Sequence, residues 1–65
     1  MNAYRLDVFA LGTWLHQESF PDLTGAMAFA DTVDRRIPVR IIGPDGDWTR
    51  RANREFTYEP AVAYS

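Results

Sequence analysis

Alternating hydrophobic and polar residues at the start of the chain predict a β-hairpin. Residues 4–10 place apolar side chains at every second position, and residues 13–20 form a second extended run. Between them, residues 11–12 make a two-residue loop, the length that joins tightly paired antiparallel strands. That loop length predicts the register of the hairpin by counting outward from it.

This register predicts which side chains face each other. One side of the hairpin carries an aromatic pair and two pairs of opposite charge, all of which are favourable cross-strand neighbours. These pairs are Phe9 with Trp14, Asp7 with His16, and Arg5 with Glu18. On the other side, Val8 faces Leu15. A slip of one residue would instead turn Phe9 and Trp14 into the core.

Apolar residues at helical spacing follow the hairpin and predict a helix over about residues 23–35. Its apolar face consists of Leu23, Ala26, Met27, Phe29, Ala30 and Val33. Asp22 suits the N-cap position, where a carboxylate also meets the positive end of the helix dipole. At the other end, Asp31 and Arg35 stand four residues apart, and Arg35-Arg36 suit the negative end.

The second half of the chain returns to strand patterns. Ile37 to Ile42 is a predicted strand, in which Pro38 belongs at the beginning or on an edge because it has no N–H to donate. Gly43-Pro44-Asp45-Gly46 has turn chemistry, with Pro44 at the second position and Gly46 able to take positive φ. Residues 47–51 form the next strand, and residues 54–58 continue it or form a fifth.

This order of elements predicts a small α+β domain of ββαββ type. Residues 1–65 form one domain, with an antiparallel-rich sheet of four or five strands, one helix packed on one face, and residues 60–65 as a loose tail. One helix can cover only one face of such a sheet. The residues expected beneath the helix are Leu6, Val8, Leu15, Ile37, Val39 and Ile41.

The uncovered face is the most suggestive surface in the sequence. Its expected apolar residues are Phe9, Trp14 and Ile42, and the expected ring around them is Arg5, Asp7, His16, Glu18 and Arg40. An apolar patch with a polar rim is typical of an interaction site.

Composition narrows the classes of function. The chain has 65 residues, no cysteine and one histidine, which excludes a disulfide framework, a thiolate metal site and a zinc cluster. Domains below roughly 70–80 residues often gain stability from disulfides, metals or a partner subunit. Oligomerisation is the one of these sources of stability that the composition leaves open. No apolar run reaches membrane-spanning length and no signal peptide opens the chain, so we expect a cytoplasmic protein without membrane contact.

Charge is unevenly distributed along the chain. The net charge is −2, but residues 1–34 carry one arginine against five acids, and residues 35–54 carry six arginines against two acids. Arg50, Arg51 and Arg54 could follow a phosphate backbone while Trp48 stacks on a base. The same arginines could also be a solvated edge that prevents strand pairing with other chains.

Two groups of residues are candidates for catalysis or for metal binding. His16 opposite Asp7 could be a base with its orienting carboxylate, but the sequence predicts no nucleophile beside the pair. Asp45-Gly46-Asp47 could hold a cation, but no third acid stands at the required spacing, and Asp-Gly is ordinary turn chemistry. We therefore expect no enzyme activity, no metal and no cofactor.

Three segments carry a resemblance. Trp14 in the second strand, AMAFA at 26–30 and PVRIIGPDG at 38–46 resemble small uncharacterised ββαββ proteins of bacteria and phages, whereas residues 48–56 do not match that pattern. The resemblance implies the fold and supplies no catalytic residues.

The sequence therefore predicts a non-enzymatic protein-interaction module. It would be a phage or mobile-element accessory protein that acts on a host protein or as a homodimer. The predicted partner-binding residues are Phe9, Trp14, Arg40 and Ile42. The alternative is nucleic-acid binding through Trp48, Arg50, Arg51 and Arg54.

Overall fold

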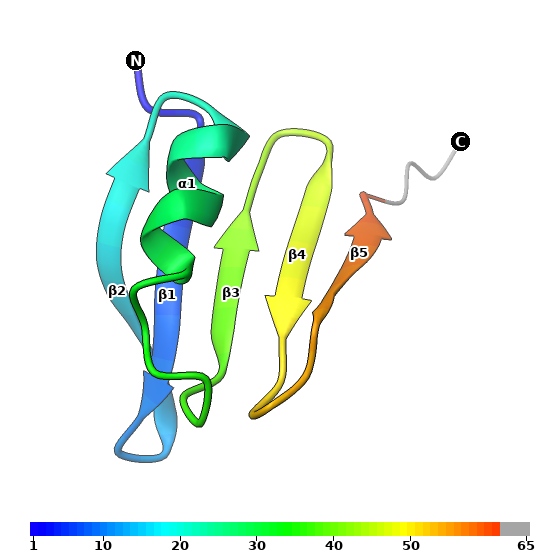
Figure 1. The fold of residues 1–65 in the computed structure, drawn as a ribbon. Coiled ribbons are helices and arrows are strands. Elements are labelled where there is room, and N and C mark those ends of the chain that lie inside the picture. Colours follow the sequence, from blue (N-terminus) through cyan, green and yellow to red (C-terminus); the bar gives the residue numbers. More distant parts are fainter. Residues whose placement is uncertain (62–65) are drawn as a thin grey trace.

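One antiparallel sheet and one helix make up residues 1–61, the part of the chain that the computed structural model describes (Figure 1). The elements are β1 (Tyr4–Ala10), β2 (Thr13–Phe20), α1 (Leu23–Ala30), β3 (Val39–Ile42), β4 (Gly46–Arg50) and β5 (Phe56–Pro60). The five strands lie in the order β2-β1-β3-β4-β5, and every neighbouring pair is antiparallel. The predicted α+β fold of ββαββ type is confirmed, with the fifth strand present.

The β1–β2 hairpin has the predicted two-residue loop. Leu11 and Gly12 both have positive φ, at 55° and 80°, as the tightest hairpin turns require. The predicted pairs of Phe9 with Trp14 and of Asp7 with His16 are both formed. The register at this end of the hairpin is therefore confirmed.

A β-bulge changes the register at the other end of the hairpin. The shift lies between Leu6 and Asp7, where β2 contains one extra residue, Gln17. Arg5 consequently lies opposite Ser19, so the predicted pair of Arg5 with Glu18 is wrong. The bulge turns the end of β2 so that the following aromatic residue packs toward the helix.

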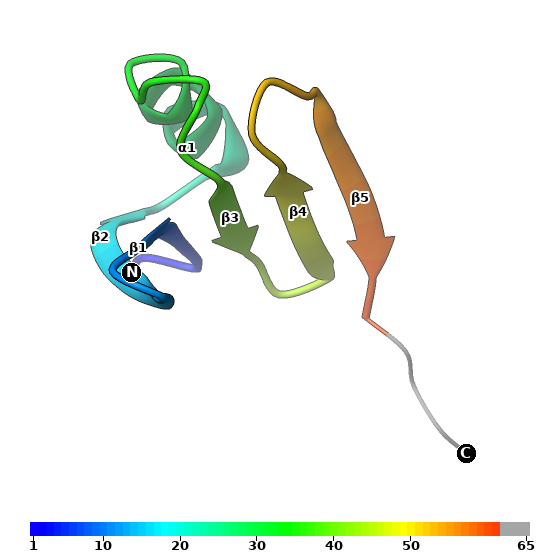
Figure 2. The same cartoon turned by 90° about the horizontal axis from the view of Figure 1, so that it is seen from below.

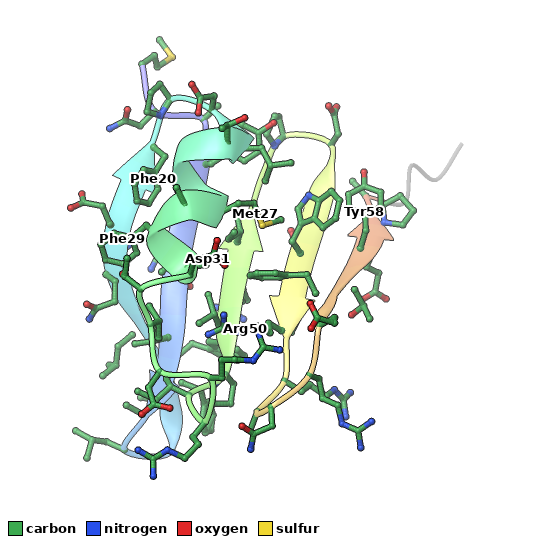
Figure 3. All side chains as sticks on the ribbon, in the orientation of Figure 1. Phe20, Met27, Phe29, Asp31, Arg50 and Tyr58 are labelled. Carbon is green, nitrogen blue, oxygen red and sulfur yellow. The ribbon has the colours of Figure 1, made fainter. Side chains whose placement is uncertain are left out.

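The aromatic residue that the bulge turns inward is Phe20. Its ring centroid lies 5.5 Å from that of Phe29 on α1, and Figure 3 shows the two side chains side by side. Asp22 then caps the helix as predicted, because its carboxylate accepts a 2.8 Å hydrogen bond from the Gly25 N–H.

The helix is shorter than predicted and ends at Ala30 instead of residue 35. Thr32 stops it, since both its N–H and its hydroxyl donate to the Phe29 carbonyl. Asp34 then accepts hydrogen bonds from the backbone and side chain of Arg36, which lower the pKa of Asp34 to about 2. The predicted helical pair of Asp31 with Arg35 is wrong as a result.

The later strands are displaced by one or two residues from their predicted bounds. β3 begins at Val39, because Pro38 precedes it and supplies only its carbonyl, which accepts a 2.9 Å hydrogen bond from the Phe9 N–H. Pro60 is the last residue of β5, and the Ala61 N–H donates to the Asp45 carbonyl at 2.9 Å. The rest of the expected tail, residues 62–65, lies outside the described residues.

The core lies between α1 and the two strands beneath it, β1 and β3. Leu6, Val39 and Ile41 are fully buried against Ala26 and Ala30, whose small side chains allow the helix to lie close to the sheet. The larger residues packed around this core are Tyr4, Val8, Phe20, Leu23, Met27, Phe29, Val33, Trp48 and Phe56.

Two of the residues expected beneath the helix are not part of this core. Leu15 and Ile37 are exposed, because α1 is short and Ile37 precedes β3. Figure 1 shows the helix in front of one half of β1, between β2 and β3, with β4 and β5 extending beyond it. Figure 2 shows α1 on one side of the sheet, and within residues 1–61 no helix covers the other side.

Candidate interaction surface

The side of the sheet opposite α1, called the open face below, carries the predicted partner-binding residues. Strand residues alternate between the two sides, and residues directly opposite each other in the register share a side. The open face consists of Arg5, Asp7 and Phe9 from β1, Trp14, His16 and Ser19 from β2, Arg40 and Ile42 from β3, Asp47 and Thr49 from β4, and Thr57 and Glu59 from β5.

An aromatic pair lies at one end of the open face. The Phe9 and Trp14 rings meet edge to face, with centroids 5.4 Å apart and an interplanar angle of 79°. Phe9 is 38% exposed, and Trp14 is half-buried. Both rings lie on the opposite side of the sheet from the helix, so the alternative register that would place them in the core is wrong.

Asp7 lies at the centre of a group of cationic side chains. It is only 1% exposed, although the sequence predicts it as part of the polar ring. One carboxylate oxygen accepts a 2.9 Å hydrogen bond from Arg5 Nε, and the other accepts bonds of 3.3 and 3.0 Å from Arg40 Nε and Nη2. His16 Nδ1 lies 3.5 Å from the first oxygen.

These contacts control the ionisation of Asp7. Burial alone would raise the pKa of Asp7, but the hydrogen bonds from Arg5 and Arg40, together with their positive charges, outweigh it. The net effect lowers the pKa of Asp7 below its ordinary value of 3.8. The carboxylate is therefore ionised at neutral pH and fixes both guanidinium groups.

Arg40 is held from two sides. Its guanidinium carbon lies 4.5 Å from the centroid of the Trp14 ring, a cation–π contact, while Asp7 binds its Nε and Nη2. Arg40 therefore links the aromatic pair to the carboxylate, and its orientation is fixed before any partner arrives. We call Phe9, Trp14, Arg40, Asp7 and Arg5 the aromatic–arginine cluster.

Ile42 and Glu18, both predicted on the open face, lie on opposite sides of the sheet. Ile42 lies on the open face beside Arg5 in the register and is half-buried, so all four predicted partner-binding residues share one side of the sheet. Glu18 lies opposite Leu6 on the helix side, because the bulge moves it away from the predicted ring.

The predicted nucleic-acid residues are divided between the two sides. Arg50 is buried on the helix side, where it donates to the Ala30 and Val33 carbonyls at 3.2 and 3.3 Å, and Figure 3 shows it beneath the end of α1. A cation at this position interacts favourably with the negative end of the helix dipole. Trp48 also lies on the helix side, with its ring centroid 4.6 Å from that of Tyr58.

Arg51 and Arg54 are the exposed arginines of that segment. They line an open hollow of about 320 Å³, whose other lining residues are Thr49, Glu55 and Thr57. Within residues 1–61, neither arginine makes an ion pair, whereas Glu55 is bound by Arg35 at 3.0 Å.

The bulge also brings Ser19 next to His16, an arrangement that the sequence does not predict. Ser19 Oγ lies 3.5 Å from His16 Nε2, and His16 Nδ1 lies 3.5 Å from Asp7. Both distances are at the outer limit of a hydrogen bond. Asp7 already gives both of its oxygens to Arg5 and Arg40, so we interpret the Ser19–His16 contact as a surface contact.

Two acidic residues of the open face were missed by sequence reasoning. Asp47 and Glu59 lie directly opposite each other on β4 and β5. Counting outward from the turn at 43–46 would have placed Asp47 on the open face, beside Ile42. The position of Glu59 could not be predicted, because the local pattern places β5 two residues too early and so ends the strand before Glu59.

Comparisons of this chain with protein-family models, curated proteins and solved structures found no match. Within residues 1–61, no three metal-ligating side chains gather closely enough to hold an ion. The helix of this part of the chain, α1, is not long and apolar enough to cross a membrane.

Proposed function

We propose that this chain is a non-enzymatic protein-interaction module that binds its partner through the open face. The observation that carries the proposal is the aromatic–arginine cluster, in which a partly exposed aromatic pair and a fixed arginine lie together on the side of the sheet opposite α1. Tryptophan and arginine are enriched among the residues that dominate binding energy at protein interfaces.

The rigidity of this cluster favours binding. An interface that immobilises a flexible arginine loses about 0.5–1.5 kcal/mol of affinity for each side chain that it orders. Here Asp7 and Trp14 already hold Arg40, so that cost has been met during folding. Arg5 donates to Asp7 through Nε, and within residues 1–61 its two Nη groups make no further side-chain bond, so they can bind a partner carboxylate.

Capture of partners by tagged protein tests the proposal. Trp14→Ala removes the ring on which Arg40 stacks, and we expect it to abolish the specific capture seen with the wild type. Leu11→Ala is the matched control, because Leu11 is apolar and 95% exposed in the hairpin loop and does not belong to the aromatic–arginine cluster. Equal capture of the same proteins by wild type and Trp14→Ala would contradict the proposal, provided that circular dichroism shows both to be folded.

A second candidate function is binding of single-stranded nucleic acid, and the hollow beside Arg51 and Arg54 favours it. Two arginines without ion pairs inside residues 1–61, beside two threonine hydroxyls, could contact phosphates. Binding would strengthen steeply as salt is lowered and would fall in Arg51→Ala. No binding of an oligonucleotide at low salt would exclude this function.

A further inference from the structure

We infer that the partner of the open face is a second copy of this chain, packed open face to open face around a two-fold axis along β3. This inference rests on the proposed function and specifies its partner. It starts from an uneven distribution of charge across the open face. On the β2, β1 and β3 side, Arg5, Arg40 and His16 surround the single carboxylate of Asp7.

Next to Ile42, β4 and β5 each carry an acid on the open face, whereas Arg51 and Arg54 lie beyond the opposite end of β4. Asp47 and Glu59 lie directly opposite each other, and like charges in that position destabilise a strand pair. Within residues 1–61, neither carboxylate makes an ion pair. These two acids therefore lack the counter-charge that the other half of the open face has in excess.

The sheet topology brings these two halves together when the face meets its own copy. β3 is the central strand of five, so a two-fold axis along it places β1 over β4 and β2 over β5 of the second copy. Arg5, Ile42 and Asp47 form one row across the three central strands. In such a dimer, Ile42 meets its own copy at the axis, and Arg5 meets Asp47 of the partner subunit.

Symmetry doubles the ionic contact, whereas the Ile42 contact on the axis occurs once in each dimer. Each dimer has two Arg5–Asp47 pairs because a two-fold interface presents the same surface from both sides. Arg40 also lies on β3, so its two copies lie near the axis. Each Arg40 is bonded to Asp7 and stacked on Trp14 of its own chain, which balances its charge and fixes its position.

The composition of the chain agrees with self-association. A domain of 65 residues buries a smaller share of its unfolded surface than a larger domain does, about 60%, and this chain contains no cysteine for a disulfide. A second subunit is the remaining common source of stability at this size. Packing the two open faces together also buries the parts of Phe9 and Trp14 that a lone subunit leaves in water.

Sedimentation equilibrium from micromolar to millimolar concentration tests the inference. We expect a monomer–dimer equilibrium whose dissociation constant rises about tenfold in Asp47→Arg, because two attractions become two repulsions. Asp31→Arg is the matched control, since it makes the same charge change at the exposed end of α1 and is expected to leave association unchanged. Equal association of wild type and Asp47→Arg would overturn the inference.

Cross-linking then locates the axis. Packed sheets lie about 10 Å apart, which is too far for a disulfide, so a short bis-maleimide is the suitable reagent. Ile42→Cys introduces the only cysteine and is expected to form a cross-linked dimer in high yield. Thr24→Cys, exposed on the helix, gives the yield of random collisions.

The outcomes separate this inference from the proposed function. A wild-type chain that stays monomeric, while Trp14→Ala still loses capture of a different protein, overturns the homodimer and leaves the interaction module in place. A dimer that cross-links through Gln17→Cys on the β2 edge instead of Ile42→Cys overturns the open-face homodimer, because association would then use the strand edge; equal capture by wild type and Trp14→Ala would overturn the interaction module as well.

Discussion

Replacing Asp7 with asparagine should destabilise the protein by about 2 kcal/mol, because this carboxylate joins three strands through its contacts. Arg5 is 56% exposed, so its pair with Asp7 contributes about 0.5 kcal/mol. Arg40 is 32% exposed and donates two bonds, which together contribute about 1.5 kcal/mol. The asparagine amide keeps the shape of the side chain but cannot balance two guanidinium charges.

Urea unfolding at pH 7, followed by tryptophan fluorescence, measures this loss directly. In thermal unfolding of a domain of this size, the same loss of about 2 kcal/mol would lower the melting temperature by roughly 8–16 °C. Arg5→Gln is the graded control, since it removes only the more exposed partner and should cost about 0.5 kcal/mol. A difference below about 0.5 kcal/mol between wild type and Asp7→Asn would refute the reasoning.

The same pair of proteins has a predictable pH dependence. The pKa of Asp7 is lowered in the folded protein, so its stabilisation is fully present above the unfolded pKa near 3.8. The stabilisation is lost as the pH falls through the lower folded pKa. The advantage of wild type over Asp7→Asn should therefore be constant from pH 5 to 7 and shrink below about pH 4. An advantage that grew on acidification would show that the sign is wrong.

Three further predictions follow from single residues. Arg50→Ala should destabilise the protein by about 3 kcal/mol in urea unfolding, because it removes two hydrogen bonds to the Ala30 and Val33 carbonyls together with buried packing. Replacing the exposed neighbour, in the control Arg51→Ala, should change the stability by less than about 0.5 kcal/mol. Gly46→Ala should cost about 2 kcal/mol in the same assay, because a Cβ would lie 2.5 Å from a carbonyl oxygen of β5. Ser19→Ala should leave the rate of hydrolysis of an activated ester unchanged; a rate lost in this variant would reveal a catalytic role.

The hairpin shows what local pattern can determine. A two-residue loop and alternating residues were sufficient to place Phe9 opposite Trp14, because both constraints act between neighbours in the chain. The bulge at Gln17 was not predictable from the same pattern. It depends on the packing of Phe20 against Phe29, a contact between an edge strand and the helix.

The helix end and Arg50 show where local pattern fails. Apolar spacing continues to Val33, but the hydroxyl of Thr32 binds the Phe29 carbonyl and ends the helix earlier. Because Arg50 lies in an arginine-rich stretch, the sequence predicts that its side chain is exposed to solvent. Its burial follows from its hydrogen bonds to the Ala30 and Val33 carbonyls, at and just after the end of α1, which come near β4 only in the folded chain.

The two tryptophans provide the most direct measurement of the central claim, which is association through the open face. Trp14 lies on that face and Trp48 on the helix side, so each indole N–H reports on one side of the sheet in the same NMR spectrum. As the protein concentration rises from micromolar to millimolar, the Trp14 signal should shift while the Trp48 signal stays constant. A shift of Trp48 alone, or of neither signal, would contradict the account.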